Sequence, residues 1–496
     1  MQAIEYLSDI LSRKFFQKFL SLVIFTLIFF VIIPPIVDAQ WSFPVKLSPN
    51  ATKAQLNENM GPCLAVSGDT LHVIWFDYRS KGTAIYYTRS IDTGLTWSVP
   101  VALTDTIGDA DFPSIAVSNG SNVHVAWRDN RFGHYASFYK RSTNGGNSWE
   151  ADFCLDSNTV FWPGIAAYGS MVVVSLNKLA NPLDNTNTEV YFMHSLDNGT
   201  IWGSEQRISN APLRSEDPAI AIEGTYIHLV WNDNRTDTMS TFYSHSLDTG
   251  TIFTADTELI DGGVETYSTM VCLNGSHVDV VSGNANPTHE FNIVLKQSSD
   301  YGMTWGQYKQ LTNGNNSDAY PYLVRDSMNM HLVYPQLSTH NAWYLYSSDG
   351  GTTWSSPLLI GNGGQPYIAY TGQTLHVIWP DSGLIYYKRN PSGNIHGTTA
   401  ISESFLTQPS DAMLSVYPNI IDRTTIIKFS IPISGNVSVS IFDIFGREIT
   451  SIIQGGQMAH GINSIIFDAS QLSPGFYFCR LKAGNSSVIA KMMVVR

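Results

Sequence analysis

A short run of apolar residues recurs along the chain with the alternation of a β-strand. The copy that begins at Leu71 reads LHVIWFDYR, so that one face carries Leu71, Val73 and Trp75. A side-chain period of two indicates a strand, and the other face is largely apolar too, which is typical of a strand covered on both sides. Further copies begin at Val123, Met171, Ile227, His277, Met330 and Leu375.

A second segment, Ser-x-Asp-x-Gly-x-Thr-Trp, recurs between two predicted strands. Its first copy, residues 90–97, reads SIDTGLTW. The third position can accept hydrogen bonds from the backbone of a turn, and the glycine can take a positive φ. The third positions of the six copies, which we expect to be structural, are Asp92, Asn144, Asp197, Asp248, Asp300 and Asp349.

These six positions lie 52, 53, 51, 52 and 49 residues apart. A repeat of about 50 residues in a chain of strands predicts the blades of a β-propeller. The sequence WSFPVKLS from Trp41 matches WSVPVALT from Trp97, so residues 41–47 are expected to complete the last blade and close the ring. We predict an all-β chain with a seven-bladed propeller over residues 40–390; a six-bladed propeller is the alternative.

The Ser-x-Asp-x-Gly-x-Thr-Trp segment resembles the Asp-box (BNR) repeat of the sialidase superfamily. The resemblance implies a propeller, but such repeats occur in sialidases, other glycosidases, lectins and non-enzymatic propellers alike, so it implies no particular chemistry. Sialidases have six blades, and their first substrate-binding arginine lies in an Arg-Ile-Pro motif. Here that position reads Asn59-Met60-Gly61-Pro62, without arginine. The resemblance therefore supports the fold more than the activity.

The period is lost from about Met413, where short alternating strands predict a small Ig-like β-sandwich over residues 413–496. The phrases VYPN, IFDIFGREI and LSPGFYFCRL resemble the C-terminal sorting domain of the type IX secretion system of Bacteroidota. The resemblance implies contact with that secretion machinery, export across the outer membrane, and then release or surface attachment. Residues 391–412, rich in Ser, Gly, Thr and Pro, are predicted to be a linker.

The N-terminal residues 1–39 are predicted to be a signal peptide. Arg13, Lys14 and Lys18 precede the apolar run 19–33, and the small residue Ala39 precedes the expected cleavage site. The run is short for a spanning helix, so no stable membrane span is expected after cleavage, with an uncleaved anchor as the alternative. Together with the sorting domain, this segment places the protein outside the cell or on its outer surface, after passage through the periplasm.

The composition of the chain limits the classes of molecule that it is expected to bind. The net charge is −13 and the pI is about 5.4, which argues against nucleic acid. The four cysteines have no metal-type spacing, so we expect free thiols and neither a metal nor a cofactor. Glycans or surface proteins are the expected partners.

Two sets of loops meet at one end of such a propeller and could bind a ligand. One set joins the second and third strands of each blade and carries Arg79, Arg131 and Arg235 in a Trp-x-Asp-x-Arg pattern. The other set joins successive blades and carries Trp162 and Tyr320. Aromatic faces suit sugar C–H groups and arginine suits hydroxyls or carboxylates, so these five residues are the predicted ligand contacts. For the arginines, recurrence in several blades favours pairing with the neighbouring aspartate, and one shallow sugar site per blade is the alternative.

Acidic residues in the same interblade loops are the candidates for chemistry. Asp109, Asp111, Glu216 and Asp217 would carry out glycoside hydrolysis if two of their carboxyl groups converge, and are otherwise solvated acids at the rim. The histidine that recurs in the second strands is expected to be structural. The leading hypothesis is a non-catalytic propeller that binds glycans or proteins, and the alternative is an exo-acting glycoside hydrolase of sialidase-like type.

Overall fold

The described residues of the computed structural model are 41–57, 61–79, 82–105, 108–158, 160–181, 184–235, 238–261, 265–314, 317–391, 413–417, 420–421, 423–431, 434–458, 461–484 and 486–495. The predicted signal peptide lies outside these residues, as does the predicted linker apart from Pro391. Within the described part, all regular elements are strands. No described helix has the length and apolarity needed to cross a membrane.

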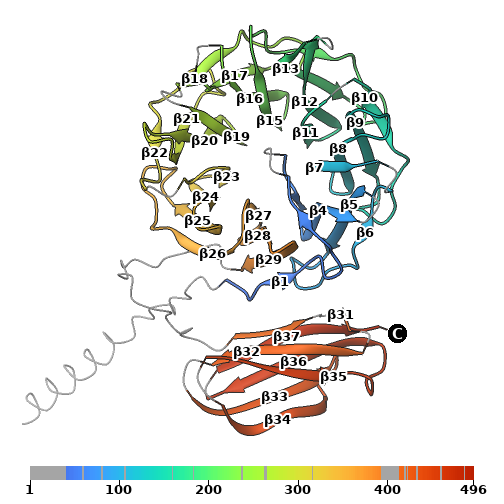
Figure 1. Cartoon of the computed structure of the whole chain (residues 1–496). Helices are drawn as coiled ribbons and strands as arrows, with labels where there is room; N and C mark the ends of the chain where they lie inside the picture. Colours follow the sequence, from blue (N-terminus) through green and yellow to red (C-terminus); the bar gives the residue numbers. More distant parts are fainter. Residues whose placement is uncertain are drawn as a thin grey trace, which may run out of the picture.

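Between Trp41 and Asn390 the described strands pair into seven sheets, which Figure 1 shows arranged in a ring. The first strands of these blades line a central channel: β3 (Leu64–Ser67), β7 (Ala110–Ser118), β11 (Gly164–Tyr168), β15 (Ser215–Glu223), β19 (Thr266–Asn274), β23 (Tyr322–Asp326) and β27 (Tyr367–Thr371). The second strands are β4 (Thr70–Arg79), β8 (Asn122–Asp129), β12 (Met171–Asn181), β16 (Tyr226–Asp233), β20 (His277–Ala285), β24 (Asn329–Gln336) and β28 (Thr374–Asp381). The predicted all-β propeller is confirmed by this pairing.

The third strands are β5 (Gly82–Ser90), β9 (Ala136–Ser142), β13 (Asp184–Ser195), β17 (Ser240–Ser246), β21 (Phe291–Ser298), β25 (Asn341–Ser347) and β29 (Leu384–Asn390). The outer, fourth strands are short: β6 (Val101–Ala102), β10 (Phe153–Asp156), β14 (Gln206–Arg207), β18 (Thr257–Ile260), β22 (Lys309–Gln310), β26 (Leu358–Asn362) and β1 (Val45–Lys46). One further strand, β2 (Ala54–Gln55), pairs with the end of β4. Each blade is thus an antiparallel meander that runs outward from the channel.

The last blade is completed by the N-terminal strand, as the sequence predicts. Val45 pairs with Tyr387 and Lys46 with Tyr386, so β1 is the outer neighbour of β29. The N–H of Leu47 extends this pairing by donating to the Ile385 carbonyl over 2.8 Å. The first and last parts of the propeller chain therefore share one sheet, and this shared sheet closes the ring.

The six Ser-x-Asp segments form one kind of turn between the third and fourth strands. In the first, the Ser90 hydroxyl donates to Asp92 Oδ1 over 2.8 Å and accepts the Gly94 N–H over 2.8 Å. The same Asp92 oxygen accepts the N–H of Thr96 over 2.8 Å. Asn144 uses its amide oxygen in the same way, accepting from Ser142 and from the N–H of Ser148. The oxygens of these side chains are therefore hydrogen-bonded within the turn itself.

Aromatic residues join each blade to the next. In five of the six turns, the Trp or Phe at the end packs edge-on against a ring of the preceding blade, with centroids 4.8 to 5.0 Å apart: Trp97 on Tyr387, Trp149 on Tyr87, Trp202 on Tyr139, Phe253 on Phe192 and Trp305 on Tyr243. A buried histidine of the second strand holds the tyrosine hydroxyl at 2.7 to 2.8 Å in His72–Tyr87, His124–Tyr139, His228–Tyr243, His331–Tyr344 and His376–Tyr387. The recurring histidines are buried inside the blades, where their hydrogen bonds to tyrosine support a structural role.

The C-terminal strands form two sheets around a separate core. One sheet contains β30 (Met413–Tyr417), β32 (Thr424–Ile431) and β35 (Gly461–Asp468). The other contains β31 (Ile420–Ile421), β37 (Ser486–Val494), β36 (Gly475–Ala483), β33 (Gly435–Asp443) and β34 (Glu448–Met458). Phe429 from the first sheet and Ile441 and Leu481 from the second are fully buried in one cluster. This is the two-sheet arrangement that the alternating strands predict. All four cysteines of the chain are free.

Candidate functional site

The loops that join successive blades meet at one end of the channel, which we call the channel mouth. Below it the channel is apolar and encloses about 300 Å³, with Ile115, Ile165, Ile220 and Leu323 among the residues that line it. Polar and titratable side chains, among them Asp111, Glu216 and Asp217, gather where the interblade loops enter the first strands. A ligand that needs hydrogen bonds would therefore be held at the mouth rather than deep in the channel.

The backbone at the mouth is strained at recurring positions. Phe112, Asp217 and Ser268 have φ of 48°, 53° and 58°, and each lies where the pairing of its first strand shifts by a bulge. Tyr320 and Gln365, at 47° and 30°, continue the series in the next two blades. Positive φ is uncommon for residues other than glycine, and bulges often re-aim side chains near functional sites. The strain orients the side chains of these loops around the mouth.

Asp111 is engaged by an arginine that the sequence pattern did not single out. Arg128 donates from Nε to Asp111 Oδ1 over 2.6 Å and from Nη2 to Oδ2 over 3.2 Å. The guanidinium lies between the rings of Phe112 and Tyr135, at 4.4 and 4.1 Å from their centroids. Burial raises the pKa of Asp111 even though Arg128 opposes the rise. Asp111 is thus half of a bidentate, ring-enclosed pair.

Asp109, from the same loop, is held by amide groups. Its N–H donates to Asn130 Oδ1 over 2.7 Å, and its Oδ2 accepts from Asn130 Nδ2 over 3.0 Å. Its Oδ1 also accepts the N–H of Thr83, over 3.2 Å, from the preceding blade. This carboxylate fixes the interblade loop to its neighbours.

Glu216 and Asp217 lie together at the mouth, two blades further on. Glu216 is half-buried and Asp217 is 2 % exposed. Burial first, and the nearby Glu216 carboxylate second, raise the pKa of Asp217 to about 7 and outweigh the side chain of Asn232, which favours the ionised form. Thr269 fixes that asparagine by donating to its Oδ1 over 2.9 Å. Burial likewise raises the pKa of Glu216, while Arg214 opposes the rise.

Two tyrosines from the next two blades complete this group. The rings of Tyr267 and Tyr320 meet edge to face, with centroids 5.7 Å apart and planes at 89°. Burial, the charge of Asp217 and the contact with Tyr320 all raise the pKa of Tyr267. We call Glu216, Asp217, Tyr267 and Tyr320 the acid–tyrosine cluster. The sequence pattern does not mark Tyr267, because the other candidate aromatic residues of these loops precede a proline and Tyr267 precedes a serine.

The predicted contact Trp162 lies in the interblade loop that leads from the Asp111 blade into the next blade, which begins with β11. It is partly exposed and stacks obliquely on Phe161, with centroids 5.7 Å apart. It therefore adds a partly exposed aromatic residue to the interblade loops.

Two of the predicted arginines form what we call arginine stacks. Arg131 bonds Asp129 Oδ2 over 2.6 Å and Asp152 over 2.9 Å, with its guanidinium 4.3 Å from the Phe138 ring. Arg235 repeats the arrangement with Asp233 at 2.6 Å, Asp256 at 2.6 Å and Phe242 at 4.3 Å. Each guanidinium is about a fifth exposed and faces two carboxylates. The side chain of Arg79 lies outside the described residues.

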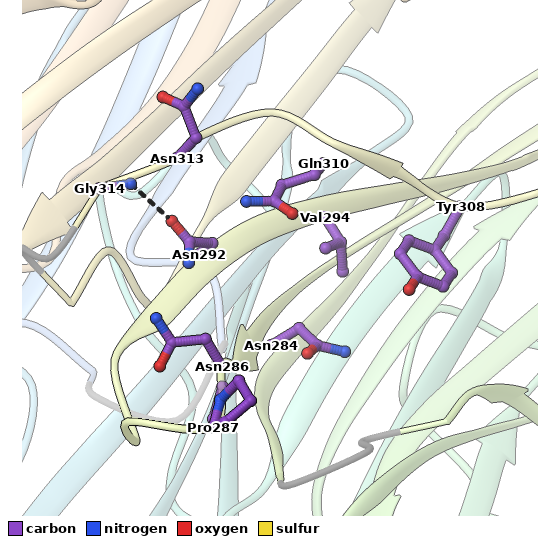
Figure 2. A pocket seen from close by; sticks show the side chains of 10 residues that line it. Asn284, Asn286, Pro287, Asn292, Val294, Tyr308, Gln310, Asn313 and Gly314 are labelled. Atoms are coloured by element: carbon purple, nitrogen blue, oxygen red, sulfur yellow. Dashed lines mark hydrogen bonds between the residues drawn. The ribbon is translucent and has the colours of Figure 1, made fainter.

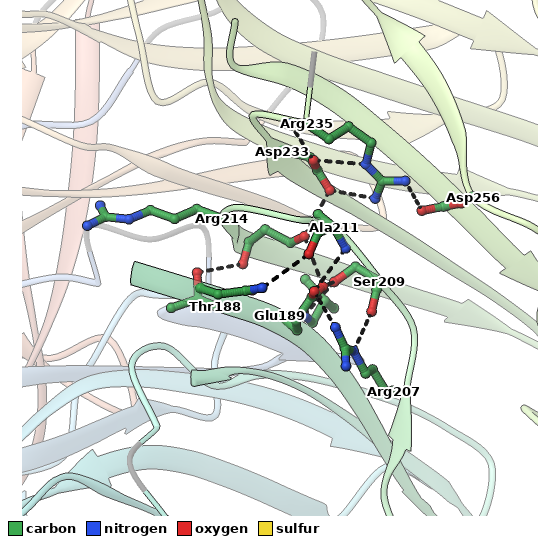
Figure 3. A network of polar contacts seen from close by, with 12 residues as sticks. Thr188, Glu189, Arg207, Ser209, Ala211, Arg214, Asp233, Arg235 and Asp256 are labelled. Atoms are coloured by element: carbon green, nitrogen blue, oxygen red, sulfur yellow. Dashed lines mark hydrogen bonds and ion pairs between the residues drawn. The ribbon is translucent and has the colours of Figure 1, made fainter. Parts of the chain in front are cut away.

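A buried glutamate links the Arg235 stack to the preceding blade (Figure 3). Glu189 is fully buried and accepts hydrogen bonds from Arg207 and Ser209. The hydroxyl of Ser215 lies 3.2 Å from Glu189 and 2.8 Å from Asp233, so it bridges two blades. Nothing in the linear pattern marks Glu189, because its partners come from a loop about twenty residues away. The network fixes the interblade loop that carries Glu216 and Asp217, two members of the acid–tyrosine cluster.

No group of three or more His, Cys, Asp or Glu in the described part of the chain is placed to hold a metal ion. The polar side chains described at the mouth are carboxyl, phenol, amide and guanidinium groups.

The fold and the mouth together define an all-β propeller followed by a two-sheet C-terminal domain. Residues 415–495 match the family described as Secretion system C-terminal sorting domain. The chain thus carries a type IX sorting domain, which indicates export to the cell surface or secretion. That prediction is confirmed.

Among solved structures, the chain is similar to the polysaccharide lyase Uly1, with 10% identity over 67% of this chain and 90% of that chain and a TM-score of 0.49. It is also similar to the GH93 alpha-L-arabinofuranosidase of Fusarium graminearum, with 14% identity, 56% and 92% coverage and a TM-score of 0.41. A leech intramolecular trans-sialidase matches at 12% identity, 68% and 69% coverage and a TM-score of 0.37. This similarity assigns no activity to the chain. The comparison with curated proteins gave no match.

Proposed function

We propose that the propeller is an extracellular glycan-binding module that takes its ligand at the channel mouth. The observation that carries the proposal is the acid–tyrosine cluster, in which three successive blades bring Glu216, Asp217, Tyr267 and Tyr320 together. Tyrosine rings offer apolar faces to sugar C–H groups, and the carboxyl groups accept hydrogen bonds from hydroxyls. The sorting domain supports the proposal, because it delivers the module to where external glycans are met.

The charges at the mouth favour a ligand without acidic groups. Arg131 and Arg235 each face two carboxylates, so they add little positive charge, and Arg128 is paired with Asp111. Glu216 and Asp217 would repel a sugar carboxylate. We therefore propose that Tyr267, Tyr320 and Trp162 make the primary contacts with the ligand. Whether the predicted arginines also contact the ligand is decided by the binding of arginine variants. A protein ligand would be recognised by the same surface.

The second candidate is a glycoside hydrolase, and one observation favours it. Asp217 has a pKa of about 7 and lies beside Tyr267, so it can exchange a proton at neutral pH, as a general acid or base must. The predicted candidates Asp109 and Asp111 are instead bound to Asn130 and Arg128. If the mouth is catalytic, the chemistry belongs to the acid–tyrosine cluster.

A glycan array probed with the full chain, followed by titration of the best ligand, tests the proposal. Tyr320→Ala should weaken binding about tenfold or more, as for a central aromatic contact, while Tyr168→Ala should not. Tyr168 is a suitable control because it is 50 % exposed at the opposite end of its blade. In parallel, fluorogenic glycosides are assayed with the wild type, Asp217→Asn and Tyr267→Phe. Hydrolysis abolished by both changes would replace the binding proposal with the enzyme, and binding unaffected by Tyr320→Ala would refute the mouth as the site.

A further inference from the structure

A groove lies beside the outer strands of one blade (Figure 2). It encloses about 410 Å³ between the loop that joins β20 to β21 and the segment around β22. Its polar lining consists of amide side chains and one phenol: Asn284, Asn286, Asn292, Gln310, Asn313 and Tyr308. None of the described residues that line it is charged. We call it the amide groove.

The corresponding space in two other blades is filled. In the blade of β15 to β18, the Arg235 guanidinium covers Phe242 and bonds Asp233 and Asp256. The indole of Trp231 packs on the same Phe242 ring, with centroids 6.3 Å apart, and donates to Asp233 over 3.2 Å. Ring, indole and guanidinium occupy that position together.

Strand register shows how the amide groove arises. Ser282 pairs with Val294 as Trp231 pairs with Phe242, so a serine and a valine stand where the filled blade has its indole and ring. Asn284 and Asn286 follow Ser282 at the same spacing as the aspartate and arginine of the stack. Small and uncharged side chains at these places open the space and remove its internal ion pairs.

The amides of the groove are oriented by the protein. Asn292 is 7 % exposed and its Oδ1 accepts the N–H of Gly314 over 3.0 Å (Figure 2). Gln310 Nε2 donates to the Thr312 carbonyl over 2.8 Å. These bonds leave the donor end of Asn292 and the acceptor end of Gln310 for a ligand. Tyr308 stands 52 % exposed beside them.

We propose that the amide groove is a second saccharide-binding site, specific for a neutral sugar. Oriented amide donors and acceptors match the hydroxyl groups of a sugar, and the exposed phenol ring offers a face to its C–H groups. The volume lies in the range of small-ligand sites. An uncharged lining gives no partner to a carboxylate, sulfate or phosphate, so acidic sugars are disfavoured. The site stands on its own residues and does not depend on the channel mouth.

Titration calorimetry of the full chain with cellohexaose, xylohexaose and mannohexaose tests the proposal, with oligogalacturonate as the acidic counterpart. At least one neutral hexasaccharide should bind, and oligogalacturonate should not compete with it. Tyr308→Ala should weaken that binding about tenfold or more. Val294→Phe, which restores the ring of the filled blades, should do the same by occupying the groove. Gln310→Ala, at an exposed position, should also weaken binding, and it tests the groove even if the Val294→Phe variant does not fold.

The control is Tyr168→Ala, which removes a tyrosine of similar exposure, 50 % against 52 %, from outside the groove. It should bind the hexasaccharide like the wild type. Binding that survives Tyr308→Ala and Gln310→Ala, or the absence of binding by all three neutral probes, would overturn the proposal. Binding that is lost in Tyr320→Ala but kept in Tyr308→Ala would support the channel mouth and reject the groove, and the reverse pattern would do the opposite.

Discussion

The indole of Trp97 packs edge-on against the ring of Tyr387, with centroids 4.8 Å apart and planes at 69°. Trp97 belongs to the first blade and Tyr387 to the last, so this contact lies at the joint where the ring closes. The same contact joins Trp149 to Tyr87 within the body of the ring, at 5.0 Å. The closing joint therefore uses the same parts as an ordinary interblade joint.

Gly94→Ala should destabilise the closed ring strongly. Gly94 has φ of +81°, and a Cβ built there would lie 1.7 Å from the Tyr387 hydroxyl. We expect a loss of about 2–4 kcal/mol in the free energy of unfolding, measured by urea denaturation, from backbone strain plus overpacking. Gly120→Ala is the matched control, because its φ is +75° and the nearest atom is 4.0 Å away. It should cost only the left-handed strain, about 1–2 kcal/mol; equal losses would mean that the contact with Tyr387 is unimportant.

Removing residues 40–48 should weaken the propeller as a whole. The deletion takes away β1 and the ring of Trp41, which packs edge-on on Tyr344 at 5.5 Å. It also removes Ser48, whose hydroxyl accepts the N–H of Ile385 over 2.7 Å. An exposed third strand in the last blade should lower the melting temperature and promote association through the open edge. Calorimetry and size-exclusion chromatography measure both effects, and an unchanged melting temperature in a monomeric variant would contradict the closure.

The sequence foretold the parts of this fold that repeat. Alternation in LHVIWFDYR and its copies reports a strand covered on both faces, and the structure buries Trp75, Trp127 and Trp231 completely. The likeness between the segments at Trp41 and Trp97 foretold the closing strand, because both supply a fourth strand. Such features depend on neighbouring residues in the sequence and recur in each repeat, so they can be predicted from the sequence.

The candidate site was harder to predict because it consists of residues that depart from the repeat and meet across blades. Asp111 was selected from its loop, but its partner Arg128 comes from the facing strand, 17 residues later. Tyr267 meets Asp217 and Tyr320 only because three loops converge on the channel. Positions that break the pattern, such as Ser282 in the place of a tryptophan, are visible in an alignment of the repeats, yet their effect depends on which side chains face them.

Arg131→Ala tests whether the arginine of a stack stabilises the fold by pairing with aspartate or binds a ligand. Asp129 is 1 % exposed and would lose its partner, so we expect about 2–4 kcal/mol of destabilisation in urea. The double variant Arg131→Met with Asp129→Asn should recover much of the loss, because no buried charge is then left alone. If Arg131→Ala instead melts like the wild type and abolishes glycan binding, the arginine is a ligand contact. Arg214→Ala, at an exposed arginine, is the control for charge alone.

The buried histidines should make the propeller less stable in acid. Burial, assisted by the nearby Arg89, lowers the pKa of His72 to about 4, and burial lowers that of His331 to about 4. From about pH 6.5 down to about pH 4 the unfolded chain binds protons at these sites and the folded chain does not, so stability falls as the pH falls. Each histidine should contribute a slope of up to about 1.4 kcal/mol per pH unit in this window. His331→Gln should reduce proton uptake on unfolding at pH 5 by nearly one proton, measured calorimetrically in buffers of different ionisation enthalpy; an unchanged uptake would mean that His331 is protonated in the fold.

Asp217→Asn should stabilise the protein in alkali while weakening its ligand site. The pKa of Asp217 is raised from 3.8 to about 7, so between these values the folded chain holds a proton that the unfolded chain has released. Its contribution is therefore complete at low pH and is lost as the pH rises through this window. Asparagine cannot ionise, and it tolerates the positive φ of 53° at this position.

Urea denaturation at pH 5 and pH 8 measures the effect, with Asp111→Asn as the contrasting variant. Asp217→Asn should gain stability relative to the wild type on going from pH 5 to pH 8. Asp111→Asn should lose about 2 kcal/mol at both pH values, because it takes the carboxylate away from Arg128. Glycan binding at the mouth should fall in Asp217→Asn although its fold is more stable at pH 8, which is the pattern of a residue retained for its chemistry. If Asp217→Asn is instead less stable than the wild type at pH 8 and binds glycan normally, the carboxylate serves the fold and the acid–tyrosine cluster loses its central member.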